Sequence, residues 1–389
     1  IMVYGISYYF IFIIPFFFYY ISDKLSNNLN KFLLFFVLLI FALFTGSRVE
    51  IGGDWGTYLK NYYILGKDFN FTDFNIRSDW GYEILSYIFY SNQQPIYFFN
   101  LLISFFNFFC LFLFLRNQDY KWIFLIISVP FFVIVLQIGF IRQSVAISFL
   151  LLSMLAIKNK YYLPFIIFMI FGIMFHKSSL LIFLIMILCI DKLINVVLKY
   201  FIFFIFIGII IYLSRGDFGN LLSNYFINIS TDSKGAIFRL FLVLIPSIIF
   251  IIYFNKFNFS LFEKRFFLIL SLMTFILIPL VFFYSTLVDR LLIYYLPFQL
   301  VIYSSISKIA NQENTKKLIN ISIISLFTLY LFVWLNFSNS SNRWVPYSSF
   351  LKGDNISYNY NMQILLECEE FYNIYGYFDR YQHQKYDCE

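Results

Sequence analysis

The chain has 389 residues, of which 61% are hydrophobic and only 13% are charged, and its formal net charge is +7. A mean hydropathy of +0.77 excludes a soluble globular protein, because no soluble fold of this length hides so much apolar surface. The apolar runs are continuous and approach the about 20 residues that a helix needs to cross a bilayer, which excludes the alternating strands of a barrel. We therefore predict an all-α polytopic membrane protein, a helical bundle.

Twelve membrane segments are predicted, separated by short loops rich in Lys, Arg and Asn. Because several are short, we expect some to tilt or to pair as re-entrant hairpins. In chain order the segments are residues 3–22, 32–45, 95–115, 122–137, 143–157, 161–175, 178–191, 199–213, 237–254, 266–284, 291–307 and 318–337.

Basic residues gather in one set of loops, and this asymmetry predicts the orientation. Lys and Arg in short loops beside the spans resist translocation, so this set faces the cytoplasm. The net charge of +7 is then a topology signal rather than a nucleic-acid footprint, and we expect no nucleic-acid partner. The opposite set faces outward and includes residues 46–94, 214–236 and the polar, tyrosine-rich tail 338–389.

The predicted organisation is a membrane domain over residues 1–337 with an extracytoplasmic tail over 338–389, which we interpret as a docked appendage. The first span lacks a basic n-region and a small-residue cleavage site, so we expect it to stay as an anchor. The stretch 82–90 is expected to form an interfacial helix. In the tail, Cys368 and Cys388 form a disulfide only in an oxidising compartment, and the sequence leaves this pairing open.

The familiar motifs of metal and nucleotide chemistry are missing from the sequence. It contains no CxxC, HExxH, Walker or GxGxxG pattern. We therefore predict no cofactor and no metal site; a divalent metal stays open as an alternative, although no ligand cluster in the sequence supports it. The second half does not repeat the first, which weakens a transporter interpretation. Two short polar runs remain as candidates for function, residues 48–58 and 175–180.

Four arginines fall at or near the outward ends of the predicted spans: Arg48, Arg142, Arg239 and Arg290. Fixed guanidinium groups facing one chamber would suit a diphosphate. The alternative is that each arginine snorkels to the outer headgroups. Arg142 has no acidic neighbour in the sequence, so its partner must come from elsewhere or from a ligand. Asp289 precedes Arg290 and makes a structural pair plausible there.

A general base has two candidates. His176 follows a predicted helix and precedes Lys177, and its near-neutral pKa would let it accept a proton from a hydroxyl. The alternative role for His176 is to cap the helix end. Asp54 competes for the same catalytic role, and its own alternative is an ordinary turn aspartate that pairs with Arg48.

Two clusters in the outward segment combine an acid, an aromatic residue and glycine. In the first, Gly52 and Gly53 permit a tight turn that presents Asp54 and the indole of Trp55. The second cluster is residues 79–82. Stacking on an aromatic face together with hydrogen bonds is a common way to bind sugars, so the pair favours a carbohydrate ligand over a purely apolar one.

Four runs in order carry a family resemblance: residues 48–58, 79–82, 141–146 and 175–180. Each motif is weak alone, but their order and spacing together resemble the EpsG-type group of Wzy-like polysaccharide polymerases over about residues 1–350. Further points of resemblance are Arg290 followed by Tyr294 and Tyr295, and a Trp-x-Pro-Tyr run at 344–347.

The sequence departs from that group at one position. The group leads us to expect glutamate before the Gly-Tyr pair, and this chain has Asp79 there, with Glu83 just after. Which of the two carboxylates serves the position is left open.

The resemblance implies a GT-C-like membrane glycosyltransferase in the bacterial inner membrane, with its active site facing the periplasm or exterior. It would join undecaprenyl-diphosphate-linked oligosaccharide repeat units, as donor and acceptor, into O-antigen, capsular or exopolysaccharide, with a chain-length regulator as a further partner. The expected catalytic residues are His176, Asp54 and Arg142. The expected substrate-binding residues are Arg48, Arg290, Arg239, Trp55, Tyr58, Asp79, Trp80, Glu83, Gln143, Lys177 and Tyr294.

Three other classes remain as alternatives. A ligase that moves finished polysaccharide to another lipid would use the same chemistry with a different acceptor. A flippase or exporter needs a continuous polar path, yet mid-span positions here are nearly all apolar. A membrane acyltransferase would also place a histidine near the membrane, but no acidic residue is adjacent to His176.

Overall fold

The computed structural model describes residues 5–68, 79–190, 233 and 235–352, and within these it is all-helical. The predicted span 199–213, most of the 214–236 loop, and both tail cysteines lie outside the described residues. The chain divides into two compact units, Ile1–Ser148 with Asn320–Glu389, and Phe149–Ile319. Each unit is described by itself below.

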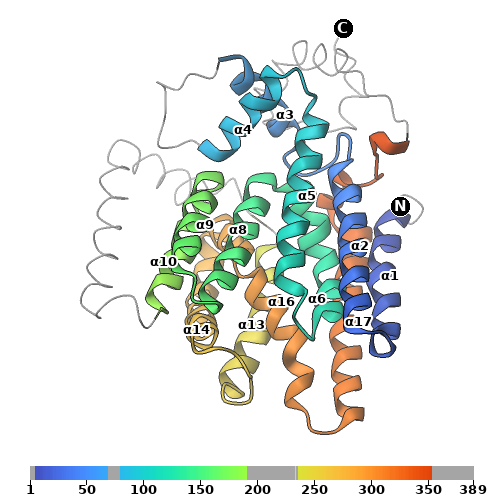
Figure 1. The fold of residues 1–389 in the computed structure, drawn as a ribbon, viewed down its shortest axis with the longest axis vertical. Helices are drawn as coiled ribbons and strands as arrows, with labels where there is room; N and C mark the ends of the chain where they lie inside the picture. The colour runs from blue at the N-terminus through green and yellow to red at the C-terminus, as the bar shows by residue number, and fades with distance from the viewer. Residues whose placement is uncertain (1–4, 69–78, 191–232, 234, 353–389) are drawn as a thin grey trace. The chain divides into compact units, whose positions relative to one another are not determined.

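The first unit is built around the antiparallel pair α2 and α5, which lie side by side in Figure 1. They approach most closely at Gly46, where a Cβ atom would lie 2.9 Å from the Cα of Leu101. Such small residues allow membrane helices to pack backbone against backbone. The helices of this unit are α1 (Ile6–Ile21), α2 (Asn27–Gly46), α3 (Trp55–Asp68), α4 (Trp80–Ser91), α5 (Ile96–Leu115), α6 (Lys121–Ser128), the π-helical η2 (Val129–Leu136), α7 (Gln137–Gly139), the start of α8 (Ile141–Lys158) and most of α17 (Glu313–Phe337).

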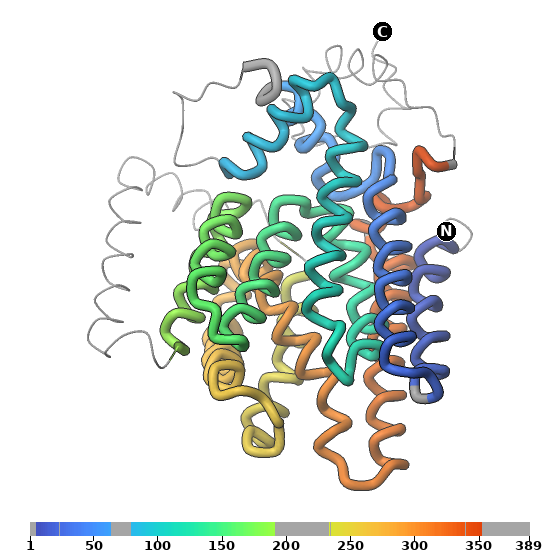
Figure 2. The backbone as a smooth tube through the Cα atoms, in the orientation of Figure 1, coloured from blue at the N-terminus to red at the C-terminus, as the bar shows by residue number. Residues whose placement is uncertain are grey.

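The second unit contains the hairpin of α9 and α10 and a group in which α13 packs on α14, α15 and α16 (Figure 2). In the hairpin, Gly172 makes room for the ring of Phe183, because a Cβ at this glycine would lie 2.7 Å from it. The helices of this unit are the end of α8, α9 (Tyr162–Phe175), α10 (Ser179–Leu188), α13 (Ala236–Ile252), α14 (Leu261–Phe283), α15 (Ser285–Ile293), α16 (Leu296–Ser305) and the start of α17.

The prediction of twelve membrane segments is not confirmed. Every predicted segment within the described residues coincides with helix, but only six helices are long and apolar enough to cross a membrane. A seventh span results if the pair Ser285–Ile293 and Leu296–Ile309, bent by 60°, is counted as one. The apolar helices α1, α9, α10 and α13 are shorter, and at 1.5 Å per residue they fall short of a hydrocarbon core of about 30 Å.

The predicted helix over 82–90 is confirmed as α4, whereas α3 is a helix that the sequence analysis did not predict. Both belong to the stretch between α2 and α5. The chain after α17 returns to the end of α2: the N–H of Val49 donates to Ser348 (3.1 Å), and that of Phe350 donates to Ser47 (3.0 Å). Residues 338–352 therefore hold the segment that carries Arg48.

Candidate anion-binding site and the predicted site residues

Arg48 lies just beyond the end of α2 and is 1% exposed, the largest fully buried side chain among the described residues. Its Nη1 donates a hydrogen bond to the carbonyl oxygen of Thr45 (2.5 Å), while its Nε has no acceptor within the described residues. Burial lowers the pKa of Arg48 to about 10, which leaves the group charged at neutral pH. Arg48 is therefore not a headgroup-snorkelling arginine.

The groups that interact electrostatically with Arg48 are tyrosines: Tyr58, Tyr347, Tyr8 and Tyr82. Burial raises the pKa of Tyr58 and of Tyr82, so both hydroxyls are neutral at physiological pH. In the described part of the chain, no carboxylate forms an ion pair with Arg48. The predicted alternative, in which Asp54 pairs with Arg48, is not what the structure shows.

A buried cation without a counter-ion is costly, because removing one ion from water costs several kcal/mol that only an opposite charge recovers. Proteins tolerate such a cost mainly at functional sites. The environment of Arg48 thus favours an anionic ligand, with the phenol groups available as hydrogen-bond partners for it.

Arg142 begins α8, and its partner comes from the segment before α4. Its Nη1 lies 2.8 Å from Oδ2 of Asp79, and the guanidinium lies 5.7 Å from the ring centre of Tyr58 and 5.9 Å from that of Tyr82. These distances are in the range of cation–π contacts. Tyr58 and Tyr82 therefore connect Arg142 with Arg48.

The two acidic residues beside the Gly-Tyr pair, Asp79 and Glu83, make different contacts. The carboxylate of Asp79 contacts Arg142, and its backbone carbonyl accepts from the N–H of Tyr82 (2.9 Å) at the start of α4. Glu83 lies in the first turn of α4, and its N–H also donates to the carbonyl of Asp79. Of the two acids, Asp79 forms the ion pair with Arg142, and which of them serves the position of the expected glutamate stays a prediction.

The break between α7 and α8, which sets the direction of Arg142, is fixed by a buried polar network. The amide of Asn107 on α5 donates to Gln137 (2.8 Å) and to Ser144 (2.9 Å), and its oxygen accepts from Ser148 (2.7 Å). All three partners lie in η2–α8, so α5 positions this break. Gln143, next to Arg142, is also buried.

Gly52 brings the Arg48 segment against this break. Its φ of +123° is a conformation that favours glycine, and a Cβ there would lie 2.8 Å from the carbonyl of Ile138. Trp344, from the returning segment, packs over the same region, 2.7 Å from where a Cβ of Gly139 would lie. The glycines of the first polar run therefore serve close packing of backbone segments.

The aromatic residues that were expected to face sugar lie in different environments. Trp55 is 4% exposed and stacks on Tyr97, with ring centres 5.9 Å apart. Tyr58 is buried as well, whereas Trp80 is partly exposed. Asp54 precedes α3 and, after burial, contributes to the raised pKa of Tyr58. Of the three aromatic residues, only Trp80 retains solvent-accessible surface beyond a few per cent.

In the second unit, His176 contacts another predicted site residue. The Tyr294 hydroxyl and Nδ1 of His176 are 2.6 Å apart, and which group donates depends on the tautomer of the imidazole. His176 also ends α9, with its N–H donating to Gly172 (3.1 Å), and Lys177 follows in the turn. His176 can therefore end α9 through its backbone and still use its imidazole in chemistry.

The sequence made a pair between Asp289 and its neighbour Arg290 plausible, but Asp289 pairs with Arg239 instead. That carboxylate forms an ion pair with Nε of Arg239 and accepts a hydrogen bond from Ser233 (3.0 Å). Arg239 is thereby paired within the protein, and Arg290 is exposed on α15.

The structure therefore brings together Arg48, Tyr58, Asp79 and Arg142 in the first unit, and His176 with Tyr294 in the second. Whether the four arginines face one chamber stays a prediction, since two belong to each unit. Among the described residues no cluster of three or more His, Cys, Asp or Glu has a geometry suited to a metal ion. Sequence analysis did not name Tyr8 or the amide-bearing positions of α5, and it included Tyr347 only as part of the Trp-x-Pro-Tyr run.

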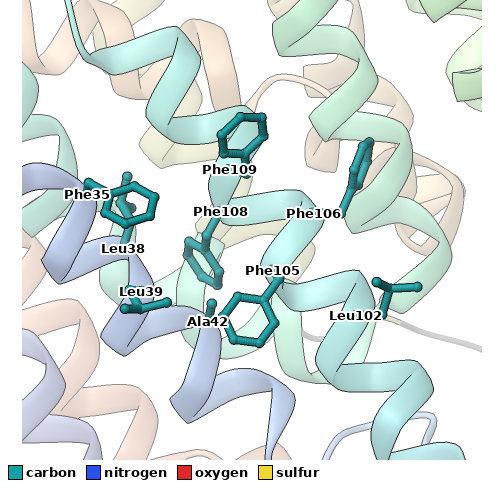
Figure 3. A pocket seen from close by; sticks show the side chains of 9 residues that line it. All are labelled: Phe35, Leu38, Leu39, Ala42, Leu102, Phe105, Phe106, Phe108 and Phe109. Atoms are coloured by element: carbon teal, nitrogen blue, oxygen red, sulfur yellow. The ribbon is translucent and has the colours of Figure 1, made fainter.

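A groove of about 350 Å³ lies between α2 and α5, with nine apolar side chains around it (Figure 3). Phenylalanines predominate: Phe35 from α2 and Phe105 and Phe109 from α5 are among them. Phe35 and Phe109 are exposed to the surroundings of the bundle. The groove can thus contact a hydrocarbon chain directly.

These features define a multi-pass helical membrane protein with a buried, uncompensated cationic site. The chain belongs to the EpsG family, whose family model matches residues 31–349. This is a family of Wzy-like polysaccharide polymerases, as the resemblance in the sequence indicates. Comparisons with curated proteins and with solved structures found no match.

Proposed function

We propose that this protein is a polymerase that joins oligosaccharide repeat units carried on polyprenyl diphosphate, with its site on the outer face of the bacterial inner membrane. The single observation that carries the proposal beyond family membership is Arg48, a buried cation that has no carboxylate partner within the described residues. A lipid diphosphate supplies the missing negative charge.

The reaction balances without a cofactor. A hydroxyl of the acceptor repeat unit attacks the anomeric carbon of the donor chain, the bond from that carbon to the diphosphate oxygen breaks, and the electron pair stays with the diphosphate. The hydroxyl proton passes to a base. Because the lipid diphosphate is already an activated leaving group, the step needs no nucleotide.

Arg48 and Arg142 stabilise the charge that builds on the diphosphate as the bond breaks. Both belong to the first unit and share the rings of Tyr58 and Tyr82. The ion pair with Asp79 fixes the position of Arg142 before substrate binds. Preorganised charge of this kind acts without reorganisation during the reaction.

The base is either Asp54 or His176. Asp54 is supported by its proximity to Tyr58, next to the arginines. His176 is supported by its bond to Tyr294, which orients the imidazole. Trp80, which is partly exposed, supplies an aromatic surface for sugar, and Arg290 is an exposed cation on α15 of the second unit.

The groove between α2 and α5 supports a lipid-linked substrate. Its lining is apolar, and α2 ends two residues before Arg48. An isoprenoid chain in the groove would leave its diphosphate at the end of the helix pair that carries the arginine. The hydrocarbon then stays in an apolar environment while the headgroup reaches charge.

Reconstitution tests the proposal. Purified lipid-linked repeat units are added to the full-length protein in vesicles, and products are separated by size. A ladder of dimers and longer products supports a polymerase. Transfer of single units only to a second lipid acceptor supports the ligase alternative, and release of unchanged lipid-linked units on the other side of the membrane supports a flippase. Either result would overturn the proposal.

A further inference from the structure

Asn100 on α5 is a buried amide that the proposed chemistry does not use. It is 1% exposed, and neither its Oδ1 nor its Nδ2 has a hydrogen-bond partner in the described part of the chain. Buried amides are nearly always bonded, because desolvating a donor or acceptor without replacing its hydrogen bond is costly. An amide with both atoms unbonded is therefore an exception that requires a reason.

The helix register places Asn100 beside the Arg48 segment. One turn further along α5, Ser104 bonds to Thr45 of α2 (2.8 Å), and Thr45 in turn accepts the hydrogen bond from Arg48. Residues four apart share a helix face, so Asn100 faces the same side as Ser104, one turn nearer to where α2 ends. Since α2 and α5 are antiparallel, this is the level of Arg48.

A second unbonded donor lies on the same side. Trp55 stacks on Tyr97, which is one turn before Asn100 on α5, and the indole N–H of Trp55 has no acceptor within the described residues. The Nε–H of Arg48 is likewise without an acceptor there. Three buried side chains around one helix end thus present unused hydrogen-bonding groups.

Asn107 provides the contrast. It lies two turns along the same helix, is equally buried, and uses both Nδ2 and Oδ1 in the bonds to Gln137, Ser144 and Ser148. The helix therefore carries two buried asparagines of the same exposure, one fully bonded within the protein and one unbonded. Burial alone therefore does not explain why the amide of Asn100 is unbonded.

We propose that Asn100 is a substrate-binding residue that recognises a hydroxyl of the sugar next to the diphosphate, an inference that rests on the proposed function. A hydroxyl both donates and accepts, which matches the free Nδ2 and Oδ1 of an amide. Arg48 beside it binds the phosphate. The two side chains together distinguish a glycosylated lipid diphosphate from the bare lipid diphosphate that polymerisation releases.

A stability measurement separates this role from a structural one. Asn100→Leu removes two unbonded polar atoms, so the thermal midpoint of the ligand-free protein should stay unchanged or rise. Asn107→Leu, the matched control, breaks a bonded network and should lower the midpoint by about 2 °C or more. If leucine does not fit, the pair Asn100→Ala and Asn107→Ala gives the same comparison. A fall for Asn100 variants as large as that for Asn107 variants would overturn the inference.

Binding measures the recognition itself. Two probes are titrated into the full chain in nanodiscs: polyprenyl diphosphate, and the same lipid carrying one sugar. For Asn100→Leu, affinity for the glycosylated probe should fall about tenfold while affinity for the bare lipid diphosphate is unchanged. Equal affinities of wild type and Asn100→Leu for the glycosylated probe would overturn the inference alone. A wild type that binds neither probe would overturn the proposed function and the inference with it.

Discussion

Replacing Arg48 by methionine should remove function without removing stability. Burial lowers the pKa of Arg48 to about 10, and a fall of this size corresponds to about 3 kcal/mol of unfavourable burial of the charge. The bond to Thr45 returns about 1.5–3 kcal/mol, as hydrogen bonds from charged groups do. The net change in the free energy of unfolding for Arg48→Met is therefore between about 0 and a gain of 1.5 kcal/mol.

Thermal unfolding of the detergent-solubilised full chain measures this. The comparison variant is Arg142→Met, which removes the ion pair with Asp79 and should cost about 1–3 kcal/mol, the lower part of the range reflecting the partial exposure of Arg142. Polyprenyl diphosphate should raise the midpoint of the wild type and not that of Arg48→Met. If Arg48→Met is destabilised as much as Arg142→Met, Arg48 has a structural partner and the reasoning fails.

Three further predictions concern other contacts. Asp79→Asn should keep the packing but weaken the hydrogen bond that positions Arg142, and it should lower polymer yield about tenfold at near-normal expression. An unchanged yield would contradict this positioning role of Asp79. Gly46→Val should force α2 and α5 apart and cost at least about 2 kcal/mol in thermal unfolding, whereas wild-type stability would refute the close packing. Tyr294→Phe should lower turnover if His176 is the base and leave it unchanged if Asp54 is, as initial rates will show.

The sequence predicts the helical class and the membrane environment well, because a long apolar run has few stable structures other than a membrane helix. It overestimates the spans, since hydropathy marks an apolar helix such as α9 or α10 without saying whether its length crosses the bilayer. The short helix α3, with its mixed composition, gives no clear apolar signal and was missed.

In the site, sequence reasoning identified Arg48 and Arg142 as charged residues at the ends of apolar runs, and Asp79 from its cluster with an aromatic residue and glycine. It did not predict which arginine is paired, because Arg142 and Asp79 lie 63 residues apart and only the fold brings them together. Tyr8, which also interacts with Arg48, was missed for the same reason, since it lies 40 residues before Arg48.

Asn100 and Asn107 did carry a signal, since both are amides inside an apolar run and polar residues in such runs are commonly functional. What separates them is whether the amide is bonded, and that depends on side chains from η2–α8. Composition and spacing contain no information on such partners.

The central claim is that Arg48 is a buried cation that binds the diphosphate of a lipid-linked sugar donor. Its most direct test is polymerisation in vesicles by the wild type and by Arg48→Met, at equal amounts of inserted protein. The account predicts a ladder of products from the wild type and none from Arg48→Met. A ladder of equal length and rate from Arg48→Met would contradict it.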